Sequence, residues 1–486
     1  MITNSKSIFG FNAYHLSLIA GAAVAATSVA AADLPSGKAS PVKYVQICDA
    51  YGSGFFTVPG TDTCTRLGGA ARFETQYTPG RDVYSIATGA LTQSASLQDT
   101  NGFQARGVIY LDSRTPTELG VARTYLRIRS ANTSGNQSQG AANNFDTSYK
   151  ASSGSKTGIT LERAYVTWGG FTFGNMSSEW AGLWPSGTFV GGAADFTAGW
   201  TNGVKGLAYT QHFGGGWTAN VSLQDRSDTG PNNGFSTPSG LTIPVQVSNT
   251  SVMTPSTGID LIGVIRNEGA WGGAEFNVMT GNNSVGTYNS LGAQTGNQSY
   301  ASWAVNSTVQ INLPMIAAGD AFYVNVGYGV GANAYAGAPD TVSTLVSDST
   351  NRRILGGILI APSDLSVTSS SGGVNTWGQE KVLQSTALFT HYWTSQWRTH
   401  VSLASSTYTT PTASGAANTQ LGTVKIWATK AYVVYSPVKD FDIGVEVGYG
   451  RDNVTIQNPT AAFLANGSPG LKDSNYTTRL RVIRTF

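Results

Sequence analysis

Apolar and polar side chains alternate singly along many segments of this chain. Between Phe322 and Val330 every even position is Phe, Val or Tyr, whereas the odd positions carry Tyr323, Asn325 and two glycines. A period of two puts alternate side chains on opposite faces of a β-strand. The pattern therefore predicts strands with one apolar and one polar face, as in a membrane barrel or in a soluble β-sandwich.

The length and number of these segments favour the membrane barrel. A tilted strand crosses a bilayer in about ten residues, and sixteen alternating segments of roughly that length can be placed in the sequence. An even count is typical of outer-membrane barrels, although 203–213 and 382–392 have mixed parity. The predicted strands lie near 65–77, 103–114, 119–130, 159–168, 171–176, 203–213, 217–225, 258–266, 271–281, 300–311, 320–331, 382–392, 397–408, 425–435, 441–451 and 476–486.

The connections between these segments alternate between short and long. Seven are short, and eight are long and rich in Gly, Ser, Thr and Asn, as solvated loops are. This order predicts an all-β fold, a sixteen-stranded antiparallel up-and-down transmembrane β-barrel with short periplasmic turns and long extracellular loops. The short connections are Thr115–Glu118, Gly169–Gly170, Gly214–Gly216, Asn267–Ala270, Leu313–Gly319, Trp393–Gln396 and Ser436–Asp440, and the long ones are 78–102, 131–158, 177–202, 226–257, 282–299, 332–381, 409–424 and 452–475.

Aromatic residues flank the short turns, for example Trp168 with Phe171 and Trp393 with Trp397. Such residues form girdles at the membrane–water interface of barrels. The last alternating segment ends at Phe486, which resembles the C-terminal signal read by bacterial barrel-assembly machinery. A closed barrel is also required physically, because an open strand edge in lipid leaves backbone groups unsatisfied.

The N-terminus has the features of a cleaved secretory signal. Lys6 is followed by the apolar run Leu16–Ala26 and by small residues, and we expect cleavage after Ala31 or Ala32. The run is too short for a membrane anchor, and no later run is long enough for a transmembrane helix. We therefore divide the chain into a signal peptide (1–32), an N-terminal periplasmic or capping segment (33–64) and the barrel (65–486).

Composition narrows the chemistry. Only 12% of the residues are charged and the formal net charge is +2, so nothing points to nucleic acid as a partner. Cys48 and Cys64 are the only cysteines, and an exported protein meets an oxidising compartment. We expect a disulfide between them, with two free thiols as the alternative. No P-loop, dinucleotide fingerprint, nucleophile elbow or zinc spacing is present, so we predict no cofactor, no metal and no enzymatic activity.

The stretch Tyr44–Gly69 is the most distinctive in the chain and reads YVQICDAYGSGFFTVPGTDTCTRLGG. It strongly resembles the mature N-terminus of alpha-proteobacterial, rhizobial-type outer-membrane porins. Asp112–Gly120, Leu161–Tyr165, Phe171–Gly174 and Leu480–Phe486 resemble the same family, in the same order, while the long loops look individual. The resemblance implies a homotrimer of sixteen-stranded porins, each with its third long loop folded into the lumen.

The alternation also shows which face each arginine occupies, because residues at odd and at even positions of a strand lie on opposite faces. Many arginines fall on the polar face. Arg66 and Arg72 alternate with Leu67 and Phe73 on the first strand. In a closed barrel the last strand pairs with the first, so strands sixteen, one, two and three form one continuous wall. Because an arginine facing mid-bilayer lipid costs about 2–4 kcal/mol, these side chains must face water inside the barrel. The predicted pore-lining arginines are Arg66, Arg72, Arg106, Arg114, Arg123, Arg127, Arg129, Arg479 and Arg481, with Arg163 of the fourth strand also pointing inward.

The third long loop supplies negative charge. It contains Glu179 and Asp195, with Trp180 and Trp184 between them. We expect this loop to fold inward so that its acids face the arginines across the narrowest point of the pore. The resulting transverse field would orient water and dipolar solutes. The alternative is that these residues are ordinary solvated charges of the lumen and the loop.

The sequence thus predicts a water-filled channel for passive diffusion of small hydrophilic solutes and ions, surrounded by outer-membrane lipid and lipopolysaccharide. One alternative is a substrate-specific porin, in which Trp180 and Trp184 form a sugar-binding track. An outer-membrane barrel hydrolase and a secreted or surface-displayed β-rich adhesin are more distant alternatives.

Overall fold

The computed structural model describes most of the chain after residue 45. Residues 1–45, which include the predicted signal peptide 1–32, lie outside the described residues. Within the described ranges no helix has both the length and the apolar character needed to cross a membrane. The described ranges are 46–80, 82–84, 89–94, 96, 100–135, 156–180, 182–185, 203–226, 250–253, 258–288, 294–336, 353–355, 358–360, 364–371, 374–412, 420–466 and 472–486.

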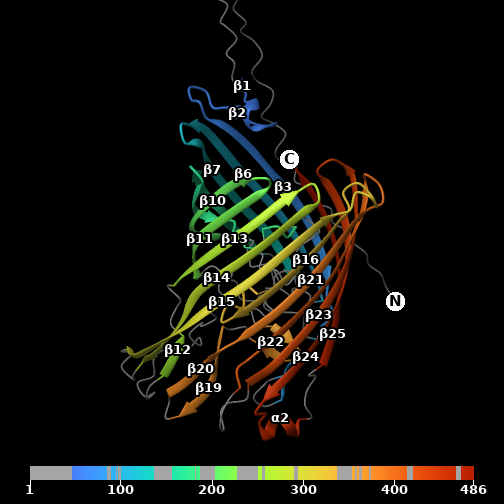
Figure 1. Cartoon of the computed structure of the whole chain (residues 1–486). Helices are drawn as coiled ribbons and strands as arrows, with labels where there is room; N and C mark the ends of the chain where they lie inside the picture. Colours follow the sequence, from blue (N-terminus) through green and yellow to red (C-terminus); the bar gives the residue numbers. More distant parts are fainter. Residues whose placement is uncertain are drawn as a thin grey trace, which may run out of the picture. The chain divides into compact units, whose positions relative to one another are not determined.

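Sixteen strands of the described residues close into one antiparallel barrel (Figure 1). Each barrel strand pairs with the barrel strands before and after it, and the ring closes where β25 pairs with β3. The predicted sixteen-stranded up-and-down barrel is confirmed, and every predicted segment overlaps one strand. The strands are β3 (Cys64–Tyr77), β6 (Asn101–Thr117), β7 (Gly120–Gly135), β8 (Lys156–Trp168), β9 (Phe171–Met176), β10 (Val204–Gly214), β11 (Trp217–Asp225), β13 (Ile259–Gly269), β14 (Gly272–Tyr288), β15 (Gln294–Asn312), β16 (Ala321–Val330), β21 (Lys381–Tyr392), β22 (Trp397–Thr409), β23 (Gln420–Val438), β24 (Phe441–Gln457) and β25 (Lys472–Thr485).

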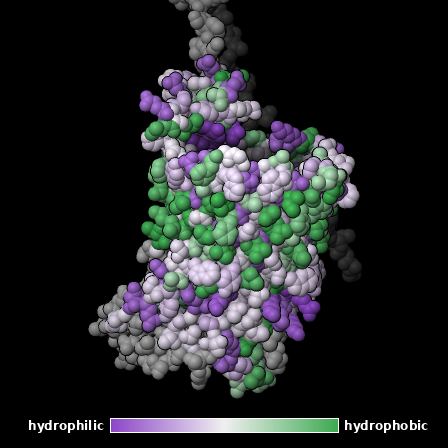
Figure 2. Space-filling view, viewed as in Figure 1, coloured by the Kyte–Doolittle hydropathy of each residue, from purple (hydrophilic) through white to green (hydrophobic). Residues whose placement is uncertain are grey.

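Side chains alternate across the barrel wall as the period of two predicts. On β13, Leu261 and Ile265 point outward and stay 45% and 47% exposed, whereas Ile262 points inward and is fully buried. Figure 2 shows apolar side chains gathered in a belt across the middle of the visible face, with hydrophilic side chains towards both ends. Lipid can replace water on such a belt because the closed ladder behind it satisfies the backbone.

Short turns join the strands at one end of the barrel. β8 and β9 are connected by Gly169–Gly170, whose φ angles of 57° and 85° are those of tight two-residue hairpins. Glycine adopts this left-handed conformation without the penalty that a Cβ atom brings. These turns keep successive strands adjacent, which positions the side chains of neighbouring inner faces against one another.

At the opposite end the ladders continue further than the alternating pattern predicted. β23 and β24 extend beyond the predicted 425–435 and 441–451, because strand pairing continues above the membrane where no apolar face is required. The short helix α2 (Ala461–Ala465) lies within the predicted long loop 452–475, and Thr460 caps it by accepting a hydrogen bond from the Phe463 amide. The long loops also carry β4 (Val83–Tyr84), β5 (Leu91–Gln93), β12 (Thr250–Met253), β17 (Arg353–Leu355), β18 (Ile358–Ile360), β19 (Leu365–Ser371) and β20 (Val374–Gln379).

The last residue completes the ring. The Phe486 amide donates to the Gly69 carbonyl at 2.9 Å, and the Gly69 amide donates to the Phe486 carbonyl at 3.0 Å. A Cβ atom on Gly69 would lie 2.7 Å from the Phe486 ring, so glycine is required for this close approach. The seam between β25 and β3 is therefore a continuous ladder down to the final residue.

The segment before β3 is tied to it covalently. It contains β1 (Gln46–Ile47), a short 3-10 turn η1 (Asp49–Tyr51) and β2 (Phe56–Thr57), which pairs with the start of β3. The predicted disulfide between Cys48 and Cys64 is confirmed, and the side chain of Phe55 is buried beside it. The predicted domain boundary after residue 64 and the capping role of 33–64 stay predictions.

Candidate functional site

The ten arginines predicted to line the pore lie on the inner faces of five neighbouring strands, β25, β3, β6, β7 and β8. Their positions oppose one another across the ladders, for example Arg72 opposite Arg106 and Arg114 opposite Arg123. Nine of them gather in threes around three carboxylates. We call these nine the arginine wall; it consists of Arg66, Arg72, Arg106, Arg114, Arg123, Arg127, Arg129, Arg479 and Arg481.

The first carboxylate is Asp112, near the periplasmic end of β6. Arg123 binds its Oδ1 atom at 2.8 Å, and Arg114 binds its Oδ2 atom at 2.9 Å. Arg66 of β3 approaches the same Oδ2 atom at 3.8 Å and keeps 37% of its side chain exposed. One buried negative charge therefore orients three guanidinium groups and leaves part of their positive charge facing the lumen.

The second carboxylate is Glu74, at the seam where the first and last barrel strands meet. Arg481 and Arg479 of β25 bind it at 2.7 and 3.2 Å, and Arg72 of β3 lies at 3.7 Å. Arg479 also lies 3.6 Å from Glu446 of β24. These ion pairs join side chains from both ends of the sequence, so the seam is held by charge as well as by backbone hydrogen bonds.

The third carboxylate is Glu162 of β8. Its oxygens bind Arg106 of β6 at 2.8 Å and Arg127 of β7 at 2.7 Å, and Arg129 forms a further ion pair with it. Arg129 is almost fully buried, whereas Arg127 keeps 39% of its side chain exposed. The group therefore has a buried structural arginine and an arginine available to solutes.

A β-bulge places Glu162. The register of β7 and β8 shifts directly after the Arg127–Arg163 pair, so Glu162 has no opposite residue. A bulge shifts the alternation by one position, and this allows Glu162 and Arg163 to face the same side. Arg163 donates to the Ser177 hydroxyl at 2.8 Å at the start of the third long loop. Arg163 is thus on the inner face, as expected for an arginine that would otherwise face lipid.

Aromatic rings cover the flat faces of the arginines near the periplasmic end. The guanidinium groups of Arg66 and Arg114 lie 5.0 and 4.9 Å from the ring centroid of Phe55, and that of Arg123 lies 5.0 Å from Tyr125. Such cation–π contacts contribute about 0.5–1 kcal/mol at exposed sites. The disulfide-linked N-terminal segment therefore helps to orient two arginines of the wall.

The inner faces of β13, β14, β15, β16 and β21 lie half-way round the ring, and we call them the facing wall. Amides dominate its centre. The side-chain amide of Asn325 donates to the side-chain oxygen of Asn306 at 2.8 Å, and that of Asn277 donates to the same oxygen at 3.4 Å. The side-chain amide of Gln384 donates to the side-chain oxygen of Asn325. This ladder is built from neutral groups, so it adds no charge to the lumen.

The third long loop is anchored to the facing wall. Glu179 binds Arg266 of β13 at 3.2 Å, and Arg266 donates to Glu275 at 2.6 Å. The Leu183 amide also donates to Glu275 at 3.1 Å. Two carboxylates therefore share one arginine here, the reverse of the three-to-one ratio on the arginine wall. Glu179 contacts the facing wall, and Asp195 lies outside the described residues.

The two tryptophans of this loop are buried. Trp180 packs edge-to-face on Tyr335, and Trp184 packs on Tyr323 of β16 and on Leu388 of β21. Their exposed fractions are only 2% and 7%. Rings in these positions hold the loop to the wall, so they offer little surface to a sugar.

The two walls together create an electrical asymmetry across the lumen. Arginines outnumber carboxylates three to one on one side, while the other side carries neutral amides and the acid-rich anchor of the third loop. Charges of opposite sign on opposite walls produce a transverse field, which is stronger in a narrow channel than in bulk water. Such a site can orient water and discriminate between small ions without any bond-making chemistry.

Parity missed two features of the lumen. It could not place Glu162, because the period of two breaks at the bulge. It also left Arg226 in a loop, although the inward positions Asn220, Ser222 and Gln224 of β11 lead directly to it. Continuing the alternation by two residues would have placed Arg226 inside.

Comparisons with known proteins agree with this architecture. A family model described as the porin subfamily matches residues 35–469. Porin Omp2a of Brucella melitensis is 35% identical over 215 residues, which cover 42% of this chain and 53% of the relative. Porin Omp2b of Brucella suis is 32% identical over 218 residues, covering 43% and 52%. The matched region spans about half the length of these curated relatives.

A solved structure has a similar fold. The outer membrane channel DcaP of Acinetobacter baumannii matches 88% of this chain and 99% of its own, with a TM-score of 0.54 and 15% sequence identity. At that identity the likeness supports the fold alone.

Proposed function

The chain belongs to this porin subfamily, and on that premise we propose that it forms a water-filled channel for passive diffusion of small hydrophilic solutes and ions. The barrel is a protein of the bacterial outer membrane, as its family and its apolar belt both indicate. The observation that carries the proposal is the arginine wall, because partly exposed guanidinium groups on an inner face require water in the lumen. Family membership also favours a channel over a barrel hydrolase.

We propose that the arginine wall and the third loop form the constriction. Support comes from the partly exposed Arg66 and Arg127 on one wall and from Glu179 on the facing wall. The field between them acts on ions and on dipolar solutes that pass. Asp195, from the same loop, is part of this proposal on sequence grounds alone.

The test removes two exposed positive charges from the lumen and leaves every carboxylate of the arginine wall with at least two arginine partners. In the double variant Arg66→Gln and Arg127→Gln, Asp112 and Glu162 each keep two arginines. We expect the reversal potential in a salt gradient across a planar bilayer to shift towards cation preference, because positive charge leaves the lumen. The matched control is Lys205→Gln, which removes a charge from the outer surface.

Two results would contradict the proposal. A correctly folded wild-type barrel that carries no current would exclude a channel. An unchanged reversal potential in the double variant would exclude the arginines from the constriction. A shift that appears equally in Lys205→Gln would mean that net charge, not lumen charge, is being measured.

The oligomer is proposed from family resemblance. We infer three copies, packed through the outer apolar surface and surrounded by lipid and lipopolysaccharide. Sedimentation of the detergent-solubilised protein measures this directly, since a protomer mass would contradict the trimer.

A further inference from the structure

At the extracellular end of β16 the chain turns into the lumen. Gly331 has a φ of 61°, a left-handed conformation that reverses the chain direction. The Tyr335 amide then donates to the Ala332 carbonyl at 3.1 Å, and the Ala336 amide donates to the Asn333 carbonyl at 3.2 Å. We call residues Gly331–Ala336 the inner turn.

Gly329 provides the seat for the inner turn. A Cβ atom at this position would lie 2.8 Å from the Ala336 Cβ atom and 2.9 Å from the Ala332 carbonyl oxygen. Real side chains do not approach that closely, so the turn lies directly on the glycine backbone. This contact explains the glycine at position 329, since glycine otherwise weakens a strand.

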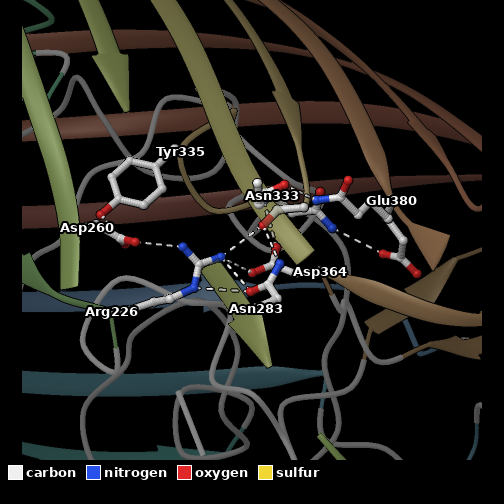
Figure 3. Close-up of polar contacts among 10 residues, drawn as sticks. Arg226, Asp260, Asn283, Asn333, Tyr335, Asp364 and Glu380 are labelled. Carbon is white, nitrogen blue, oxygen red and sulfur yellow. Dashed lines mark hydrogen bonds and ion pairs between the residues drawn. The ribbon is translucent and has the colours of Figure 1, made fainter. Parts of the chain in front are cut away.

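Arg226 holds the inner turn in place (Figure 3). Its guanidinium group is buried and donates to the Gly331 carbonyl at 2.9 Å. It also binds Asp260 at 2.6 Å, Asp364 at 3.2 Å and the side-chain oxygen of Asn283 at 2.6 Å. The planar fork of an arginine suits this arrangement, because it can serve several acceptors in fixed directions.

The two carboxylates that bind Arg226 also bind the inner turn. Asp364 accepts a hydrogen bond from the backbone N–H of Asn333 at 2.8 Å, and Asp260 accepts one from the Tyr335 hydroxyl at 2.9 Å. The network therefore connects β11, β13, the inner turn and a later part of the same loop. A buried network with every member bonded fixes one geometry, and it is disrupted by removal of any member.

The inner turn also supports the third long loop. The Trp180 indole donates to the Tyr335 carbonyl at 2.9 Å, and the two rings lie 5.1 Å apart, edge to face. Ile262, Met279 and Ala332 are buried in the same cluster. The third loop is thus not the only inward-folded segment among the described residues, and it rests on another one.

We propose that the inner turn is a second constriction element of the pore, seated on Gly329 and positioned by Arg226. This inference rests on the proposed channel function. The inner turn is itself almost fully buried, so it narrows the lumen by filling space on the facing wall and by supporting the third loop. Arg226 acts through the inner turn and contacts no solute, so it is a positioning residue.

The first test displaces the inner turn without altering any charge. In Gly329→Val the new side chain overlaps the seat. We expect amide hydrogen exchange in 331–336 to accelerate by about tenfold or more, because overpacking of a close contact is strongly unfavourable. We also expect single-channel conductance to rise. The control is Gly107→Val, the same substitution on the outer face of the barrel strand β6, where nothing lies within 4 Å of the added Cβ atom.

The second test weakens the positioning residue. Arg226→Lys keeps the positive charge but loses the planar fork, so we expect faster exchange in 331–336 and unstable open-channel current. Arg226→Met removes the charge and should have a larger effect. If Arg226→Met does not fold, Arg226→Lys and Gly329→Val still decide the question.

Each outcome is informative. Faster exchange with higher conductance in Gly329→Val, absent from Gly107→Val, supports the proposal. Unchanged amide exchange in Gly329→Val would show that the inner turn does not rest on Gly329. Faster exchange with unchanged conductance would show that the inner turn does not constrict the pore. If the wild-type barrel carries no current, the proposed function fails, while exchange in 331–336 still tests whether Arg226 and Gly329 hold the turn.

Discussion

The arginine wall and the facing wall are built from the same kind of strand, yet they satisfy their polar groups in opposite ways. On the arginine wall each buried carboxylate binds three arginines, and the remaining positive charge faces water. On the facing wall, amides bond to amides, and Asp260 of β13 is matched by buried Arg226, which directly follows β11 and also binds Asp364. The difference teaches that excess positive charge persists where guanidinium groups reach water, whereas polar groups covered by loops are paired with neutral amides or with opposite charge.

The largest expected effect comes from removing an acid of the arginine wall. Glu162→Gln leaves three guanidinium groups without their shared carboxylate, and Arg129 among them is buried. Breaking a buried ion pair from one side typically costs about 3–5 kcal/mol. We expect the barrel to unfold at a clearly lower temperature, measured by its heat-modifiable migration, and the reversal potential to shift towards anion preference.

Glu118→Gln, in an exposed periplasmic turn, is the matched control for that change. If Glu162→Gln unfolded at the wild-type temperature, the arginine wall would not need its acids. The two walls would then differ in amino-acid composition, but the carboxylates would not be needed to stabilise the arginines.

A smaller effect is expected on the facing wall. Asn306→Ala removes the amide that bonds to Asn277 and Asn325, and it leaves buried polar groups unsatisfied. Such a loss costs about 1–3 kcal/mol. We expect a modest decrease in unfolding temperature with no change in reversal potential, because no charge is removed. A selectivity shift in Asn306→Ala would show that neutral amides also contribute to ion discrimination.

The smallest effect concerns pH. Burial raises the pKa of Asp364 to about 6, although Arg226 lowers it and Asp260 adds to the rise. A solvated aspartate has a pKa of about 3.9. At a pH between these two pKa values, Asp364 therefore takes up a proton when the inner turn packs into place. The seated form is therefore favoured below pH 6 and is weakened as the pH rises through 6.

We expect amide exchange in 331–336, corrected for its intrinsic pH dependence, to be slower at pH 5 than at pH 7, by up to about tenfold. Asp364→Asn should abolish that difference, since the amide does not titrate. The charged or titratable groups around Asp364 are Arg226 and Asp260, with Glu380 and Tyr335 further along the same network. Slower exchange at pH 7 than at pH 5 would reverse the sign and exclude Asp364 as the group responsible.

The sequence predicted the barrel well because its physical cause is local. Alternation in β13 or β16 follows from lipid on one side and water on the other, and it can be read one strand at a time. The arginine wall followed from the same parity, together with the pairing of the last strand with the first. The disulfide followed from two cysteines in an exported chain.

The partners of these groups were harder to predict. Glu162 is displaced by a bulge, which a period of two cannot reveal. The inner turn depends on contacts between residues far apart in sequence, such as Arg226 with Gly331 and Trp180 with Tyr335. Glycines at 329 and 331 mark the place, but glycine in a strand has several explanations.

The seam at Glu74 has a consequence for how the barrel assembles. Arg481 lies 407 positions after Glu74 in the sequence, and Arg479 lies 403 positions after Gln76. Closing so long a loop is entropically unfavourable and slow, so this contact forms late. Until it does, Glu74 lacks two of its three arginines and the wall is incomplete. The two arginines of β25 therefore reach Glu74 at the same step that closes the strand edge, whereas the Asp112 and Glu162 clusters need only the neighbouring strands β3, β6, β7 and β8.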